Sequence, residues 1–565
     1  MRDIASRVLS TMLILSLSVN PFGFIVSQNQ SPLYMQQNYT SIERDWENVT
    51  LLHEQQYHDT TLLEDEIENI AMQVPNLVDV AIIGQSYLEQ NIYSIRITNE
   101  EITAQKAKVL VVAHHHGREQ VTVEIALRFV LRLLNSYGID DTITEYVDTE
   151  EIYVIPTVNP DALDVVVNEG NHWLRKNLRP YDDDGDGAFD EDSLQDVDGD
   201  GIISSFDVYL KAGELSNPVY SHSYYEGIDD DFDGLVNEDN IGLVDLNRNY
   251  DIFWDPSESP LSDPSSSTYA GTSPFSEPET QTFRDFVEQH RFAMAYSLHT
   301  GINATYLPAN PENEFAEPEL YPNILNDFAL LLPSGYNTGW TYDGSSTRSR
   351  NLASATLSGV WREWMYYERG TIAPIAFELY TNATSRGSEV ESVYLENETH
   401  LIIEWNGIFG FFNPLGEYID TLWSDLILSF DYLLEMTPRI KVEAISFVLD
   451  EEQPTIGHVQ IETLCKGNRI GTVNPIQVLL ANGTVVFTGE ILFPGSSDEL
   501  SLEIFTKRDR NENLTLMIGN DYVGYTEIIL LIPAIEPQVD IFILTGIIVV
   551  GFCAILVLRV FSKKK

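Results

Sequence analysis

Short, wholly apolar runs alternate with amphipathic stretches between about Leu52 and Met436, and this alternation narrows the folds open to the chain. Four runs have the length of buried strands: Val109–Ala113, Ile152–Ile155, Met294–Leu298 and Ile372–Phe377. The stretches Thr60–Met72, Val121–Leu134 and Glu279–Glu288 have helical periodicity. Apolar strands separated by helices are typical of a sheet covered on both faces. The sequence therefore predicts an α/β fold with a mostly parallel mixed sheet flanked by helices.

The pattern changes after Pro438. Short alternating runs, separated by Gly, Pro, Asn and Asp, continue to Pro533. This spacing is typical of an all-β sandwich. We therefore expect a β-sandwich domain at 437–535, acting as a spacer.

Both ends of the chain have targeting patterns. Residues 1–27 combine two arginines with an apolar run, which predicts a secretory signal that is cleaved or kept as an anchor. Residues 28–51 are polar and predict a loose linker. The uncharged run inside 541–561 is followed by a basic tail at 562–565, which predicts one transmembrane helix with the tail in the cytoplasm. We expect a single-pass protein of the cell membrane whose bulk is extracellular.

Charge and cysteine content limit the partners. The chain has 87 acidic and 32 basic residues, a net charge of −55, so nucleic acid is not an expected partner. Its two cysteines, Cys465 and Cys553, fall in the predicted β domain and membrane helix. We therefore expect no disulfide to stabilise the extracellular part.

Three residues at predicted strand ends suggest a metal site. His116 and Glu119 follow the run Val109–Ala113 with an H-x-x-E spacing, and His299 ends another buried run. Ligands bind at the carboxyl ends of parallel strands, and zinc takes imidazole nitrogen and carboxylate oxygen. The three residues are candidate zinc ligands that leave a position open for water.

Several ordered motifs resemble the zinc carboxypeptidase family of the pancreatic type, over roughly residues 52–436. They are HGRE at His116–Glu119, NPDA at Asn159–Ala162, WLRKN at Trp173–Asn177, DLNRN at Asp245–Asn249, SLHT at Ser297–Thr300 and FELY at Phe377–Tyr380. The resemblance implies a zinc-dependent metallocarboxypeptidase that hydrolyses C-terminal peptide bonds of a peptide or protein substrate.

The resemblance also implies roles for individual residues. Asn247 and Arg248 would hold the terminal carboxylate of the substrate, a task that suits the guanidinium group. Arg175 would polarise the scissile carbonyl, although neighbouring Arg179 is an alternative. Glu378 would be the general base that takes a proton from water activated by zinc.

The chain departs from the family pattern near its substrate pocket. Ala355 stands where the family places a substrate-covering Tyr, and Tyr342 is a substitute only if the loop is rebuilt. Aligning SGVWREWMY at Ser358–Tyr366 with the family pattern gives this position and also puts Arg362 at the floor of the specificity pocket, unless it pairs with Glu363 or faces solvent. A basic floor predicts a preference for acidic C-terminal residues.

An acidic insert at 180–244 separates two of the motifs. Residues 182–240 hold 19 Asp or Glu and one Lys. The D-x-D-x-D-G start of a calcium loop occurs three times, and this predicts structural calcium sites that neutralise the insert. The candidate ligands are Asp182, Asp184, Asp186, Asp196, Asp198, Asp200, Asp207, Asp229, Asp231 and Asp233. Asp190, Asp192, Asn237 and Asp239 are candidates to complete the first and third sites.

Two other functions remain open at this point. The same fold also suits a hydrolase of cell-wall peptides or of side-chain amino acids, and the altered Tyr position is compatible with one. A non-catalytic, calcium-dependent surface binding protein is the second, although His116, Glu119, His299 and Glu378 are all present.

Overall fold

The computed structural model describes most of the chain from residue 42 to residue 559. Within that range the following residues lie outside the description: 55–56, 183–186, 191, 212–217, 230–235, 238–240, 258–259, 312–313, 334–357, 383–390, 450–455, 467–472, 481–484, 493–496, 506–511, 521–523, 533–542 and 550–557. The predicted signal segment at 1–27 therefore falls outside the described residues.

A seven-stranded sheet forms the centre of the molecule, with the order β1-β2-β4-β3-β7-β9-β8. Its strands are β1 (Val78–Gln85), β2 (Asn91–Ile97), β3 (Ala107–Ala113), β4 (Glu150–Ile155), β7 (Phe292–His299), β8 (Ala304–Tyr306) and β9 (Ala373–Glu378). The strands β4, β3, β7 and β9 are parallel, whereas β1, β2 and β8 run antiparallel at the edges. The prediction of a mixed sheet is confirmed, but its parallel part is limited to the four central strands.

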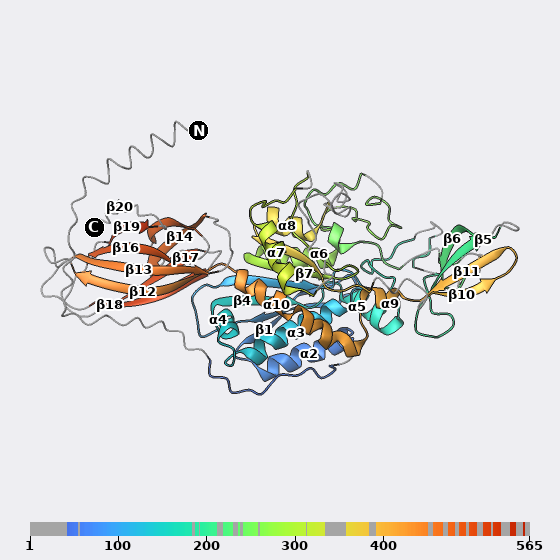
Figure 1. The fold of residues 1–565 in the computed structure, drawn as a ribbon, viewed down its shortest axis with the longest axis horizontal. Coiled ribbons are helices and arrows are strands. Elements are labelled where there is room, and N and C mark those ends of the chain that lie inside the picture. The colour runs from blue at the N-terminus through green and yellow to red at the C-terminus, as the bar shows by residue number, and fades with distance from the viewer. Residues whose placement is uncertain are drawn as a thin grey trace.

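Helices cover both faces of this sheet (Figure 1). The longer helices are α2 (Thr60–Gln73), α3 (Val121–Ser136), α4 (Asp141–Thr149), α6 (Pro278–Glu288), α7 (Tyr321–Leu331), α8 (Trp361–Tyr367) and α10 (Ile419–Met436). Short helical segments are α5 (Pro160–Asp164), the π-helix Val165–Glu169, the 3-10 turns Leu246–Arg248 and Gly416–Tyr418, and α9 (Ile408–Phe412).

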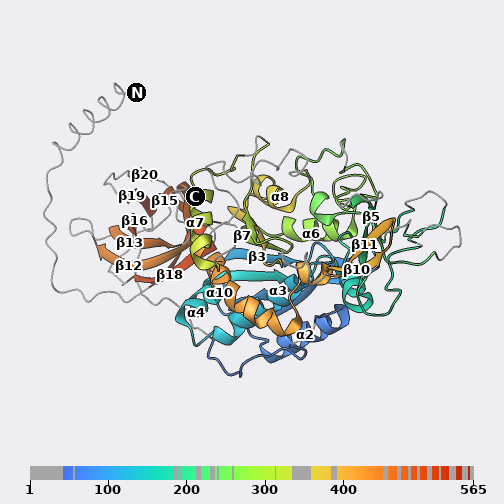
Figure 2. The same cartoon turned by 45° about the vertical axis from the view of Figure 1, so that its right-hand side comes forward.

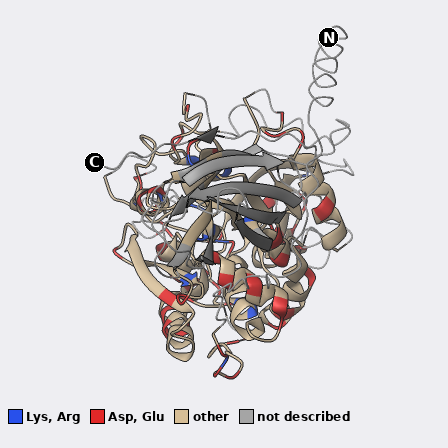
Figure 3. Ribbon diagram, turned by 90° about the vertical axis from the view of Figure 1, so that its left-hand side faces the viewer, with Lys and Arg blue, Asp and Glu red and all other residues tan. Residues whose placement is uncertain are grey.

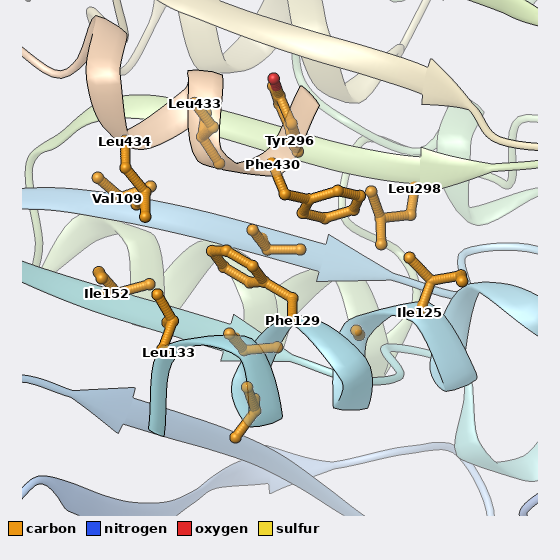
Figure 4. Packing of buried hydrophobic residues seen from close by; sticks show 14 of the residues in the cluster. Val109, Ile125, Phe129, Leu133, Ile152, Tyr296, Leu298, Phe430, Leu433 and Leu434 are labelled. Atoms are coloured by element: carbon orange, nitrogen blue, oxygen red, sulfur yellow. The ribbon is translucent and has the colours of Figure 1, made fainter. Parts of the chain in front are cut away.

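The larger apolar core lies between the sheet and the helices α3 and α10. Phe129 of α3 meets Phe430 of α10 with ring centroids 5.2 Å apart, and Tyr296 of β7 packs on Phe430 (Figure 4). A second apolar cluster joins the other face of the sheet to α6 and α8. The predicted helices and buried strands each coincide with an observed element to within a few residues.

The segment before α2 lies against the core. Arg44 donates hydrogen bonds to the carbonyls of Leu134 and Asn135, and Trp46 stacks on Tyr137 with centroids 6.0 Å apart. Val49 is buried. The prediction of a loose linker is therefore wrong for residues 42–51, because their apolar and arginine side chains close the C-terminal end of α3.

A small separate sheet projects from one end of the domain (Figures 1 and 2). It has the order β10-β11-β5-β6, with β5 (Ser205–Leu210), β6 (Val219–Tyr225), β10 (Glu391–Glu396) and β11 (His400–Trp405). The strands β5 and β6 belong to the acidic insert. They pair with a hairpin that follows residue 378, and we call the four strands the insert sheet.

The C-terminal region is all-β, as predicted. Its strands are β12 (Arg439–Leu449), β13 (Ile456–Lys466), β14 (Val473–Leu480), β15 (Val485–Leu492), β16 (Ser497–Phe505), β17 (Glu512–Asn520), β18 (Gly524–Ile532), β19 (Ile543–Val549) and β20 (Leu558–Arg559). They form two antiparallel sheets, in the orders β12-β13-β16-β19-β20 and β15-β14-β17-β18. Whether the two sheets pack as a sandwich stays a prediction.

The C-terminal region joins the central domain at the amino ends of β3 and β4. Arg439 Nη1 lies 3.1 Å from Glu150 Oε1, and the Tyr525 amide donates to the carbonyl of Gln105. This contact is at the end of the central sheet opposite to the carboxyl ends of its parallel strands.

Along the ribbon, acidic residues outnumber basic ones (Figure 3).

Part of the predicted membrane helix at 541–561 has another conformation. Ile543–Val549 forms β19, which pairs with β16. In the part of the chain that the structure describes, no helix is long and apolar enough to cross a bilayer. Isoleucine and valine suit a strand as well as a membrane helix, so the apolar run alone did not distinguish the two.

Candidate functional site

The candidate residues gather at the carboxyl ends of three central strands. The segment 114–119 follows β3, His299 ends β7 and Glu378 ends β9. His299 and Glu378 are direct neighbours in the parallel register of β7 and β9. Because parallel strands end at one edge of the sheet, residues far apart in sequence meet there.

Three side chains form the metal-binding group. His116 Nδ1 lies 2.8 Å from Glu119 Oε1, and His299 Nδ1 lies 2.9 Å from Glu119 Oε2. All three residues are buried, and their ligand atoms lie within 4.8 Å of one another. Two imidazole nitrogens and one carboxylate form a donor set that fits catalytic zinc and leaves a coordination position open. The fold thus brings together the three residues that the sequence predicts as zinc ligands.

The outer nitrogens of both histidines have partners that fix the rings. His116 Nε2 lies 3.2 Å from Asp245 Oδ1, and His299 Nε2 lies 3.1 Å from the Ser297 hydroxyl. A carboxylate behind a ligating imidazole sets its tautomer and makes it a better ligand. Asp245 is a site residue that the sequence analysis did not assign, although it begins the DLNRN motif.

Arg175 reaches the metal group from the side. Its Nε and Nη2 donate to Asp245 Oδ2 at 3.0 and 2.8 Å, while its Nη1 lies 3.2 Å from His116 Nδ1. Arg179 instead donates to Glu277 at 2.8 Å. The geometry therefore favours Arg175 over Arg179 as the arginine of the site.

Glu378 carries an unusual carboxyl group. Burial, followed by the charge of Glu119, raises its pKa well above the usual value, whereas Arg175, Arg362 and Arg118 pull it down. Among the described residues, its Oε2 has no hydrogen-bond partner. A carboxyl of this kind is suited to take up and release a proton.

Asn247 and Arg248 lie beside the metal group. Asn247 Nδ2 is 3.3 Å from His299 Nε2, and its Oδ1 accepts from the amide of Trp361. Arg248 Nη1 donates to the carbonyl of Asn247. Gly359 fits against this turn with φ of +64°, because a Cβ there would lie 1.9 Å from the Arg248 carbonyl oxygen.

Arg362 is buried on α8, close to the other two arginines. Its Nε donates to Glu363 Oε1 at 2.8 Å, and its Nη2 has no partner among the described residues. Burial, followed by Arg175 and Arg362, lowers the pKa of Arg248, so the three cations act on one region. Arg362 thus has the local pairing that the sequence left open and also lies near the site.

The second predicted calcium loop folds around a carboxylate that the sequence analysis did not select. Asp196, Asp198 and Glu226 form a group with metal-binding spacing. Asp207, the expected closing ligand, instead lies in β5 and accepts from the Ser223 hydroxyl at 2.5 Å. The structure thus brings Glu226, and not Asp207, within reach of Asp196 and Asp198.

The other acidic candidates are only partly described. Asp196 accepts from the amides of Gly199, Asp200 and Gly201, as a tight acidic loop requires. Asp182 accepts from the Gly187 amide. Outside the described residues lie Asp184, Asp186, Asp231, Asp233, Asp239, Tyr342 and Ala355.

Known proteins are similar to this chain in its central part. A zinc carboxypeptidase from Saccharothrix mutabilis subsp. capreolus is 32% identical over 22% of this chain and 29% of that protein, and carboxypeptidase B from Bos taurus is 22% identical over 58% and 63%. The chain spans less than two thirds of the length of these relatives. The structure of carboxypeptidase A from Helicoverpa armigera superposes with a TM-score of 0.44 at 18% identity, over 69% of this chain and 76% of that one.

The family model for zinc carboxypeptidases matches residues 63–425, which is more than half of the chain. This match includes every residue of the metal group together with Arg175, Asn247, Arg248 and Glu378. The chain therefore belongs to the zinc carboxypeptidase family.

Proposed function

We propose that the protein is a zinc-dependent metallocarboxypeptidase that removes the C-terminal residue of a peptide. One observation carries this proposal: the buried group His116, Glu119 and His299 lies at the same sheet edge as Glu378 and in contact with Asn247, whose carbonyl holds Arg248. A metal group, a proton carrier and a carboxylate-binding cation are the parts that the reaction needs.

Arg248 and Arg175 have different roles, one in binding the substrate and the other in stabilising the oxyanion. Arg248, steadied by the carbonyl of Asn247, binds the terminal carboxylate and so fixes which bond lies at the metal group. Arg175 keeps Nη1 directed towards that group while Asp245 holds its other nitrogens. A fixed cation at the developing oxyanion contributes about 3 kcal/mol of barrier reduction.

The proton transfer belongs to Glu378. Zinc, when bound by the three donors, supplies Lewis-acid chemistry that lowers the pKa of water. The Glu378 carboxylate takes a proton from the attacking water and gives it to the departing amine. Its raised pKa makes it a stronger base than an ordinary carboxylate.

The pocket favours an acidic C-terminal residue, as part of this proposal. Arg362 uses Nε for Glu363 and has Nη2 left for another acceptor. A substrate carboxylate would complete this buried guanidinium, whereas a lysine side chain would be repelled by it.

The experiment uses the full chain and its Glu378→Gln variant. We expect about one zinc per chain in both by elemental analysis, and release of the last residue by the native chain only, with a drop of about 10²-fold or more in the variant. Release of internal or side-chain-linked residues instead would favour the cell-wall or side-chain hydrolase. Zinc-free protein that binds a surface partner only with calcium would favour the binding protein.

We also propose that the insert binds calcium. The repeated D-x-D-x-D-G spacing and the Asp196, Asp198 and Glu226 group support it, because oxygen ligands in a tight loop suit this ion. Elemental analysis of the same sample tests it, and protein free of calcium after dialysis against excess calcium would contradict it.

A location at the outer face of the cell membrane is the third proposal. Its support is the uncharged run within 541–561 and the basic tail at 562–565. Extraction of the full chain and of a chain ending at residue 535 from membranes tests it. If β19 is instead an integral part of the β domain, the shortened chain loses stability and the full chain is found in the aqueous fraction.

A further inference from the structure

The insert sheet is an addition to the central domain that none of the proposed catalytic steps uses. Its two hairpins come from residues 205–225 and 391–405, and they meet through β5 and β11. The strands β6 and β10 form its two edges. The sheet projects beyond the domain at the end with α9 (Figure 1).

Large apolar side chains on this sheet are open to solvent. Tyr220 is 54% exposed, Val219 63%, Val393 58% and Tyr394 62%. Tyr220 and Val393 lie on one face of the sheet, and Val219 and Tyr394 on the other. Exposed aromatic and aliphatic side chains are a feature of surfaces that meet a partner.

One face of the sheet carries a stripe of aromatic residues that begins near the site. The pairing sets Trp405 and Tyr225 on this face at its inner end, and Tyr209 and Tyr220 at its outer end. Asp207 lies between them, bonded to the Ser223 hydroxyl. We call Trp405, Tyr225, Asp207, Ser223, Tyr209 and Tyr220 the aromatic stripe.

The inner end of the stripe packs against the chain segment that contains Arg175. Trp173 packs between Trp405 and Tyr225, with ring centroids 5.4 and 4.7 Å away. Trp173 lies two residues before Arg175 in the same segment. The stripe is therefore continuous with the site that holds the scissile bond.

A second link runs through the residue next to a zinc ligand. Arg118 precedes Glu119, stacks on Phe412 at 4.4 Å and lies close enough to Tyr225 to interact electrostatically. The amide of Arg118 also donates to the carbonyl of Leu174 at 2.7 Å. The metal group, Arg175 and the root of the stripe thus form one connected surface.

The charge of the sheet indicates the chemistry of its partner. Its four strands hold the carboxylates Asp207, Glu391, Glu404 and Glu396 and contain no lysine or arginine. Glu396 is paired with Lys211, whereas Asp207, as far as the described residues show, accepts from the neutral Ser223 hydroxyl. Such a surface attracts a chain that carries basic side chains.

We propose that the aromatic stripe binds the polypeptide upstream of the scissile bond, in an extended form with aromatic and basic side chains. The stripe runs over the six residues from Tyr225 to Tyr220, about 17 Å at ~3.4 Å per residue, which matches about five residues of an extended substrate. Tyrosine rings supply contact area at low entropic cost, and Asp207 pairs with a lysine or arginine of the substrate. This inference rests on the proposed function for its substrate, and it makes the protein selective for longer chains.

The test compares two substrates with the same last two residues. One is a blocked dipeptide, and the other is a peptide of about twelve residues with lysine and tyrosine upstream, long enough to cover the stripe. We expect the ratio of kcat/KM for the long and the short substrate to fall about tenfold in Tyr220→Ser. The matched control Tyr394→Ser, whose ring meets Phe206, should keep the native ratio.

A binding measurement separates this inference from the catalytic proposal. Fluorescence anisotropy of the labelled long peptide on the Glu378→Gln chain should show about tenfold weaker binding when Tyr220→Ser is added, and weaker binding when glutamate replaces the upstream lysines. This result supports the stripe even if no hydrolysis occurs. Equal peptide binding by the Glu378→Gln chain with and without Tyr220→Ser overturns the inference. It is also overturned if Tyr220→Ser leaves peptide binding unchanged and instead alters the sedimentation of the protein alone or its binding to an oligosaccharide.

Discussion

Arg175 donates two hydrogen bonds to a single oxygen of Asp245, at 3.0 and 2.8 Å, and the other oxygen of Asp245 faces the imidazole of His116. Asp245 therefore positions a ligand and a stabilising cation at the same time. A carboxylate that is buried between such partners has its pKa well below the usual value, because Arg175 and His116 outweigh the effect of burial. It stays ionised throughout the working range of the protein.

Asp245→Asn should lower kcat about 10- to 100-fold, the usual cost of losing a group behind a metal ligand. The amide would leave Arg175 with a weaker acceptor, so the oxyanion loses a well-placed donor while substrate binding changes little. Steady-state kinetics with zinc analysis measures this. Asp285→Asn on the surface of α6 is the control, and a rise in KM with an unchanged kcat would contradict the role given to Asp245.

Arg362→Gln should change the preference for the C-terminal residue. Glutamine keeps a donor for buried Glu363 but removes the charge that attracts an acidic substrate side chain. We expect the ratio of kcat/KM for Glu-ended and Leu-ended peptides to fall at least about tenfold, which corresponds to ~1.4 kcal/mol. A native chain that turns over Glu-, Lys- and Leu-ended peptides equally would rule out the preference itself.

The elements that build the site were predictable because they depend on local sequence. Each wholly apolar run, such as Val109–Ala113, became a buried strand, and the polar residue after it had to emerge at the carboxyl edge. Motif order then identified His116 and Glu119. The metal group could therefore be predicted from the sequence, because its residues are of the types that bind zinc and stand at the ends of predicted strands.

The insert sheet and the role of Asp245 were not predictable in the same way. The strand β5 pairs with β11, almost 200 residues later in the chain, and no local sequence pattern predicts such a partner. Glu226 joins the Asp196 loop only because the β5–β6 hairpin folds back, so the fixed loop spacing selected Asp207 instead. Long-range pairing decides these positions, whereas periodicity reports only on neighbours.

Stability should depend on pH through Glu279, at the start of α6. Burial raises its pKa to about 7, so the folded protein holds a proton that the unfolded chain releases near pH 4.5. Stability from this group is present at low pH and is lost as pH rises from about 4.5 towards 7, a difference on the order of 3 kcal/mol. Glu279→Gln, which mimics the neutral form, should flatten this loss.

Urea unfolding at about pH 5.5 and about pH 8.5 measures the effect, since the two values lie on either side of the raised pKa. The native chain should lose more stability between them than Glu279→Gln. Glu288→Gln at the exposed end of the same helix is the control and should behave like the native chain. An identical pH dependence in native and Glu279→Gln protein would show that Glu279 is ionised in the fold.

Calcium binding should depend on Glu226 and not on Asp207. Glu226 accepts from the amides of Val197 and Asp198 and joins Asp196 and Asp198, so its loss removes both a ligand and a brace of the loop. Glu226→Gln should abolish most of the rise in Tm that calcium gives to the native chain, because a bound ion stabilises the fold by mass action. Asp207→Asn is the matched control, because it removes one carboxylate from the same part of the insert. It should keep the rise in Tm that calcium gives to the native chain. Calorimetry with calcium and then with a chelator measures both, and the reverse result would return Asp207 to the loop and place Glu226 outside it.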